Sequence, residues 1–226
     1  LWLGSSVFQG FGARNTSPAL WIDAMDGTIS TIEVKGGTFL ASIDGSIGGG
    51  VAGSISADSS YINRLRNHTA ETDPDLDLVV VQLSTNDSKG QCETGVVSDS
   101  FDPATFDEVT TTGALEAIIA YAKETWGARV LVITGTYFED EMTYSGGQNA
   151  EIYKTMIERC HELDEKWGDD FTVLDLWHND AMYENVKTGD ALWRSYMSDA
   201  IHPTKKGYLE WWGPYIEAQL YEMLAD

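Results

Sequence analysis

The chain has 226 residues, a length that fits one domain with a sizeable hydrophobic core. Hydrophobic residues make up 42% and charged residues 22%, which excludes a disordered or fibrous protein. The 36 acidic and 14 basic residues give a formal net charge of -22, which argues against nucleic acid or an anionic membrane surface as a partner. No leader segment is recognisable although the first residue is not Met, so the compartment stays open, with the cytoplasm favoured.

Short apolar runs alternate with amphipathic stretches along the chain. Strand candidates lie at 1–3 and 31–35, and the runs at 76–83, 129–134 and 171–176 have the near-continuous apolar pattern of strands buried on both faces. The patterns typical of helices lie at 16–25, 56–66, 103–126, 148–167 and 203–224, and Asp102 before Pro103 predicts the start of the third. Strands that alternate with helices predict parallel βαβ units. We therefore expect a single domain over residues 1–226, a three-layer α/β/α sandwich with about five parallel strands.

The sequence contains no recognisable metal-binding motif and too few cysteines for a disulfide framework. Cys92 and Cys160 are too few for a disulfide framework and are not spaced as metal ligands, so we expect two free thiols, with one bridge between them as the alternative. His161-Glu162 begins a zinc-protease pattern, but Glu165 stands where the second histidine would be needed. We expect neither a metal nor a cofactor.

Small and polar residues follow the predicted strands, at the edge of a parallel sheet where ligands bind. Ser6 lies in a glycine-bounded turn after the first strand, where its hydroxyl can be exposed. Gly37 follows the second strand and lets the backbone approach a substrate. Asn86 follows the third strand and offers a neutral donor for a developing oxyanion. Asp199 and His202 lie three residues apart, so the carboxylate can hold the imidazole while its other nitrogen faces Ser6.

In this order, the blocks Gly4-x-Ser6, Gly37, Asn86-Asp87 and Asp199-x-x-His202-Pro203 resemble the SGNH/GDSL hydrolase superfamily. The resemblance spans nearly the whole chain and implies a flavodoxin-like α/β/α sandwich. It implies Ser6 as nucleophile, His202 as base and Asp199 as the residue that orients His202. It also implies an oxyanion hole formed by the Ser6 N–H, Gly37 and Asn86.

The chain departs from the family pattern in two blocks. The first block is usually Gly-Asp-Ser, whereas this chain has Gly4-Ser5-Ser6, which leaves Ser5 as a rival nucleophile. The third block is usually Gly-x-Asn-Asp, and Ser84 stands in the glycine position. Both Gly36 and Gly37 fit the second block, and Gly37 is chosen because it directly precedes a threonine.

The expected function is a serine esterase that hydrolyses short-chain carboxylic esters through an acyl-enzyme. The resemblance suggests small acyl groups on carbohydrates or short lipid-like esters, and the acidic composition favours deacetylation of a carbohydrate. The expected partner is therefore a small-molecule or saccharide ester, with the oligomeric state left open. One alternative is a GDSL-type lipase or lysophospholipase acting on lipid esters. The others are a nucleotide-binding flavodoxin-like module that uses the glycine-rich segment 48–53, and an inactive ligand-binding module.

Aromatic residues near the predicted site are candidates for substrate contact. Phe8 follows the nucleophile, and Tyr137 and Phe138 follow the fourth strand, so these three are expected to line a shallow groove. Trp193 and Tyr196 lie shortly before Asp199 and could line the same cleft.

Overall fold

The computed structural model describes residues 1–46, 54–89, 92–138, 148–179 and 191–225. At its centre is a five-stranded parallel sheet with the strand order β2-β1-β5-β6-β7. The strands are β1 (Trp2–Gly4), β2 (Ile32–Val34), β5 (Leu78–Gln82), β6 (Arg129–Ile133) and β7 (Phe171–Leu174). Every residue of β5 is buried, as its near-continuous apolar sequence predicts for a strand covered on both faces. The predicted fold class is confirmed, and the strand order is the flavodoxin-like one.

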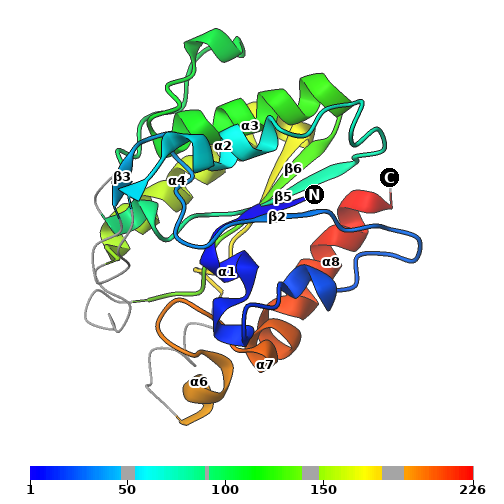
Figure 1. Ribbon diagram of the computed structural model, residues 1–226, viewed down its shortest axis with the longest axis vertical. Coiled ribbons are helices and arrows are strands. Elements are labelled where there is room, and N and C mark those ends of the chain that lie inside the picture. The colour runs from blue at the N-terminus through cyan, green and yellow to red at the C-terminus, as the bar shows by residue number, and fades with distance from the viewer. Residues whose placement is uncertain (47–53, 90–91, 139–147, 180–190, 226) are drawn as a thin grey trace.

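Helices cover both faces of the sheet (Figure 1). On one face lie α2 (Tyr61–Leu65), α3 (Thr111–Trp126) and α4 (Ala150–Trp167), and on the other lie α1 (Ser6–Gln9) and α8 (Gly213–Leu224). The remaining described elements are short. They are β3 (Gly45–Ser46), β4 (Ser54–Ile55), η1 (Phe11–Ala13), η2 (Pro18–Leu20), η3 (Ala57–Ser59), η4 (Asp87–Lys89), η5 (Pro103–Thr105), η7 (Gly168–Asp170), α6 (Ala191–Tyr196), α7 (Lys205–Gly207) and η8 (Tyr208–Trp212).

The predicted helices 16–25 and 103–126 are wrong in extent. In the first, Ser17 caps only the 3₁₀ turn η2, and the chain leaves helical geometry at Trp21, where φ is -123°. In the second, Asp102 does act as a cap, because its carboxylate accepts from Ala104 N (3.0 Å), but the helix it starts is η5 alone. The long helix α3 begins only after Thr110, whose side chain provides a new cap.

The strand order places the site at one edge of the sheet. After β1 the chain moves outward to β2, and the next strand of the sheet, β5, pairs on the other side of β1. Parallel sheets bind ligands at such a switch point, beyond the carboxyl ends of the strands. Ser6 follows β1 there, and Asn86 follows β5.

Both cysteines are buried free thiols. Burial raises the pKa of the Cys92 and Cys160 thiols well above the ordinary value, so both stay protonated at neutral pH. Within the described ranges, no helix is long and apolar enough to cross a membrane. In the same ranges, no cluster of three His, Cys, Asp or Glu side chains is arranged to hold a metal ion.

Candidate active site

Three residues from opposite ends of the chain form a hydrogen-bonded series. Ser6 is the first residue of α1, and its Oγ lies 2.8 Å from Nε2 of His202. Nδ1 of His202 lies 2.8 Å from Oδ2 and 3.0 Å from Oδ1 of Asp199. This geometry can activate a serine hydroxyl, because the imidazole can take its proton while the carboxylate orients the ring.

The Asp199–His202 segment forms a tight turn that fixes the carboxylate. Oδ1 of Asp199 accepts hydrogen bonds from the backbone N–H groups of Ile201 and His202, both at 2.8 Å. Burial by itself raises the pKa of Asp199, but its hydrogen bonds and charge interaction with His202, together with these two amides, lower it overall. The carboxylate therefore stays ionised at neutral pH and can stabilise an imidazolium.

The two adjacent serines have different environments. Ser5 is fully buried, and its Oγ accepts a hydrogen bond from Nε2 of Gln82 (3.0 Å). Ser6 is half-buried, and its hydroxyl contacts His202. Ser6, rather than Ser5, therefore has the geometry of a nucleophile.

The loop after β2 is tied to the end of β5. Nδ2 of Asn86 donates to the backbone carbonyl of Thr38 (2.9 Å), which uses one of the two N–H donors of the amide. The carboxylate of Asp87 accepts from the backbone N–H groups of Leu40 and Ala41, both at 2.9 Å. These bonds position the loop, and within the described residues the second amide hydrogen of Asn86 has no partner.

Gly36 and Gly37 have different structural roles. A Cβ at Gly36 would lie 2.3 Å from Oε1 of Gln9 and 3.8 Å from Cα of Ser6, so Gly36 lies beside α1 and a larger residue there would displace the end of the flexible Gln9 side chain. Gly37 has φ +79°, a left-handed conformation that favours glycine. The choice of Gly37 for the oxyanion hole stays a prediction.

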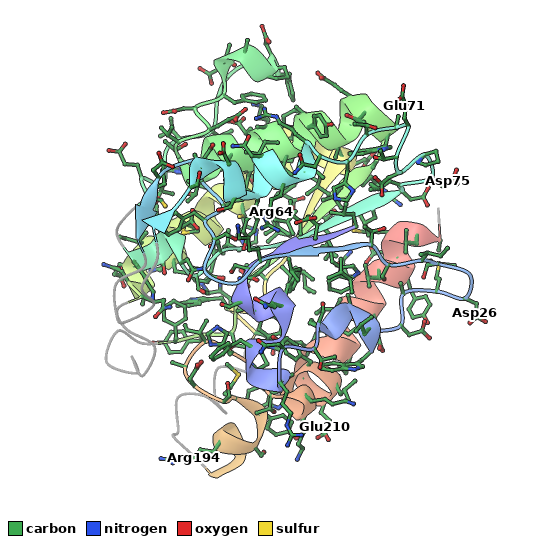
Figure 2. All side chains as sticks on the ribbon, in the orientation of Figure 1. Asp26, Arg64, Glu71, Asp75, Arg194 and Glu210 are labelled. Carbon is green, nitrogen blue, oxygen red and sulfur yellow. The ribbon has the colours of Figure 1, made fainter. Side chains whose placement is uncertain are left out.

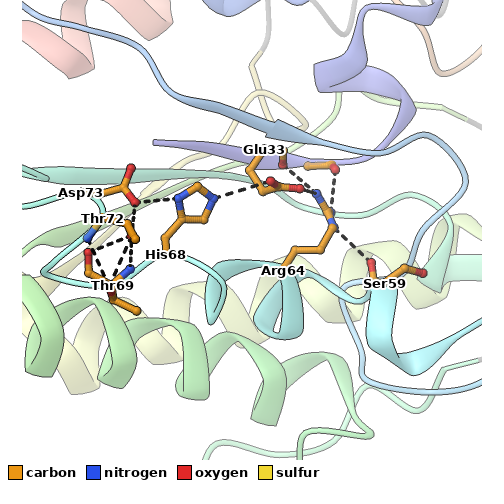
Figure 3. A network of polar contacts seen from close by, with 8 residues as sticks. Glu33, Ser59, Arg64, His68, Thr69, Thr72 and Asp73 are labelled. Carbon is orange, nitrogen blue, oxygen red and sulfur yellow. Dashed lines mark hydrogen bonds and ion pairs between the residues drawn. The ribbon is translucent and has the colours of Figure 1, made fainter.

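Arg64 of α2 is buried, and Figure 2 shows it in the interior of the protein. Its guanidinium donates to the backbone carbonyls of Gly4 (2.8 Å), Glu33 (2.7 Å) and Ser59 (3.1 Å), and it forms an ion pair with the Glu33 carboxylate at 3.2 Å (Figure 3). His68 continues this network from Glu33 to Asp73, as Figure 3 shows. A single buried side chain therefore links the carboxyl ends of β1 and β2, directly before the candidate site.

A model of the GDSL-like lipase/acylhydrolase family matches residues 2–209. The chain belongs to this family. A search of the curated proteins finds no match.

Solved structures share the fold at low identity. A protein from Lactobacillus plantarum is 19% identical over 99% of this chain and 94% of its own, with a TM-score of 0.62. A carbohydrate acetylesterase family member from Sinorhizobium meliloti is 14% identical over 100% and 98%, with a TM-score of 0.58. A family two carbohydrate esterase from Clostridium thermocellum, in complex with cellohexaose, is 14% identical over 99% and 63%, with a TM-score of 0.59.

The prediction that Phe8, Tyr137 and Phe138 line a shallow groove is wrong for two of these three residues. Phe8 is fully buried and packs on Trp2, with ring centroids 5.2 Å apart. Phe138 is also buried and packs on Trp177 at 4.8 Å. Their side chains belong to the core that supports the site, and only Tyr137 keeps some exposed surface.

Tyr196, another aromatic candidate, adds no exposed surface to the site. Tyr196 is buried, and its ring stacks on that of Trp211 with centroids 4.4 Å apart. The side chain of Trp193 lies outside the described residues.

Sequence reasoning missed Phe11, an exposed aromatic residue beside the candidate triad. Its side chain is 58% exposed, and its ring centroid lies 4.8 Å from that of His202. Gly12 makes this contact possible, because a Cβ there would lie 2.8 Å from the His202 carbonyl oxygen and 2.3 Å from that of Pro203. The glycines on both sides of Phe11 were the signal in the sequence that this loop approaches another segment.

A cavity of about 600 Å³ lies at the other end of the sheet of this GDSL-like hydrolase. It is lined at the amino ends of β1 and β5 by Trp2, Leu78 and Asp75, among others, and Figure 2 shows Asp75 at this periphery. None of its lining residues belongs to the Ser6–His202–Asp199 series. The cavity is therefore separate from the candidate active site.

Proposed function

We propose that this GDSL-like hydrolase is a serine esterase that cleaves short-chain carboxylic esters through an acyl-enzyme. The observation that carries the proposal is the unbroken series of contacts from Ser6 to His202 to Asp199, at 2.8 Å each. An inactive binding module would have no need to keep this series aligned. The alternative nucleotide-binding segment, 48–53, lies outside the described residues.

In the proposed reaction, Oγ of Ser6 forms a bond to the ester carbonyl carbon while Nε2 of His202 takes the hydroxyl proton. The resulting oxyanion accepts hydrogen bonds from the Ser6 N–H, the second amide hydrogen of Asn86, and the backbone N–H of Gly37 or Gly36. The C–O bond to the alcohol then breaks, and His202 returns the proton to the leaving oxygen. Water repeats the sequence on the acyl-enzyme, which releases the carboxylic acid and restores Ser6.

The proposed substrate is an acetylated carbohydrate. Two neighbours with the same fold are described as carbohydrate esterases, which suggests this substrate class without fixing the sugar. The exposed ring of Phe11 beside His202 offers an apolar surface to a small acyl or sugar group. The net charge of -22 disfavours adsorption to anionic lipid, which argues against the lipase alternative.

Labelling with a serine-directed fluorophosphonate tests the nucleophile. Wild type and Ser5→Ala should be labelled, and Ser6→Ala should not. Ser5→Ala is the matched control, because it removes a neighbouring hydroxyl that contacts Gln82 instead of His202. Labelling that follows Ser5, or none in the wild type, would contradict the proposal.

A substrate panel then separates the esterase from the lipase. Acetylated sugars and p-nitrophenyl esters of increasing chain length are compared by kcat/KM. Each buried CH₂ contributes about 0.8 kcal/mol, so a deep acyl pocket would raise kcat/KM steadily with chain length. We expect acetyl esters to be preferred. An octanoyl ester that exceeds the acetyl ester tenfold would favour the lipase alternative.

A further inference from the structure

Gln82, the last residue of β5, is buried directly against the turn that carries Ser6. Its Oε1 accepts hydrogen bonds from the backbone N–H groups of Ser5 and Phe8, both at 3.0 Å, while its Nε2 donates to Oγ of Ser5. We propose that Gln82 is a positioning residue that sets the orientation of Ser6 for attack, an inference that rests on the proposed esterase function.

Gln82 supplies what the first turn of α1 lacks. The first N–H groups of a helix have no partner within the helix, and a capping side chain usually accepts from the third helical residue. Ser5 is the N-cap of α1, but its side chain makes no such bond. The side-chain carbonyl of Gln82 accepts from the N–H groups of the N-cap residue, Ser5, and the third helical residue, Phe8. In a capping box these two N–H groups are held by side chains of the helix itself, whereas here one side chain from a neighbouring strand holds both.

This capping leaves the Ser6 N–H available. Within the described part of the chain, no residue accepts a hydrogen bond from it, while the N–H groups of Ser5 and Phe8 are both held by Gln82. The proposed mechanism needs such a free donor for the oxyanion. One side chain thus fixes the turn on both sides of Ser6 without bonding to Ser6 itself, so the Ser6 hydroxyl keeps its contact with His202 and the Ser6 N–H can serve the oxyanion.

The turn depends on outside support because α1 has only four residues, too few to be stable alone. Arg64 holds the carbonyl of Gly4, and the Tyr208 hydroxyl donates to the carbonyl of Val7. Each of these makes one bond to the turn, whereas Gln82 makes three. A displacement of the nucleophile by about 1 Å can reduce the rate by about 10², so the loss of Gln82 should appear in the chemical step.

The test compares Gln82→Met with Tyr153→Phe. Tyr153 is a matched control, since its hydroxyl accepts from Gly135 N (2.7 Å) and donates to the Leu83 carbonyl (3.2 Å) without touching the nucleophile turn. Gln82→Met should reduce kcat and the fluorophosphonate labelling rate of folded protein by about 10², with KM changed less than threefold. Tyr153→Phe should lower the melting temperature and keep both rates within threefold of wild type. Equal rates in the two variants would overturn the proposal.

Amide hydrogen exchange of the wild type provides a second test that does not depend on a variant folding. The amides of Ser5 and Phe8 should be protected, and that of Ser6 should exchange faster. Equal protection of all three would overturn the proposal. The esterase function fails separately, because it predicts labelling of the wild type, whereas the exchange pattern reports only how Gln82 holds the turn.

Discussion

Replacement of Asp199 by Asn should nearly abolish turnover while leaving the turn intact. Oδ1 of Asp199 is held by two backbone N–H donors, from Ile201 and His202, at 2.8 Å each. In Asp199→Asn, the amide oxygen must stay on these donors, so the amide nitrogen takes the place of Oδ2, 2.8 Å from Nδ1 of His202. That nitrogen donates, so Nδ1 must accept and the ring proton moves to Nε2. Nε2 then cannot take the proton of Ser6.

The same change of tautomer in a Ser-His-Asp triad lowers kcat by about 10⁴, or about 5.5 kcal/mol in activation free energy. The assay is kcat on p-nitrophenyl acetate, corrected by active-site titration, with the melting temperature measured in parallel. Asp175→Asn is the matched control, because Asp175 contacts His178 (2.7 Å) and His161 (3.0 Å) outside the site, and its kcat should stay within threefold of wild type. A kcat of Asp199→Asn within tenfold of wild type would refute the reasoning.

Four further outcomes are expected. Asn86→Ala should lower kcat by about 10²–10³ with KM nearly unchanged, since its amide acts on the oxyanion, and turnover within threefold of wild type would exclude that role. Phe11→Ala should raise KM for p-nitrophenyl acetate by about threefold to tenfold at near-normal kcat, and an unchanged KM would show that its ring does not touch substrate. Arg64→Met should lower the free energy of unfolding in urea by about 3 kcal/mol, because buried carbonyls lose their donor, and a loss under 1 kcal/mol would contradict this. Because folding lowers the pKa of Asp199, its ionised form stabilises the protein above the unfolded value of about 3.9 and loses this effect as pH falls through the lower folded value. The difference in unfolding free energy between wild type and Asp199→Asn should therefore shrink between pH 5 and strong acid. An increase in this difference over the same pH range would contradict the prediction.

The sheet could be predicted from the sequence because a strand that is buried on both faces needs apolar residues at nearly every position. The run at 76–83 is apolar throughout, and β5 within it is buried at every position. The helix at 16–25 could not be placed in this way. Ser17 and Pro18 give the same start signal for one 3₁₀ turn as for a long helix, and only packing decides how far the turn continues.

The site residues differ in how far the sequence could place them. Ser6, Asp199 and His202 carry reactive groups in recognisable blocks, and the structure brings them into contact. Phe8 was misplaced, because its position close to Ser6 in the sequence does not determine the side to which its ring points. Phe11 was missed, since its contact with His202 joins segments about 190 residues apart and has no local pattern.

Contacts of Gln82 explain why Ser5 can stand where the family's Gly-Asp-Ser block usually has Asp. At the second position of the block this chain has Ser5, which is fully buried. A carboxylate there would lose its hydration and would need charged or multiple donors, whereas a hydroxyl needs one or two partners. Gln82 is a neutral side chain that can both donate to that hydroxyl and accept from two backbone amides. A neutral pair at this place leaves no fixed negative charge beside the oxyanion that Ser6 would create, so the substitution is compatible with the proposed chemistry.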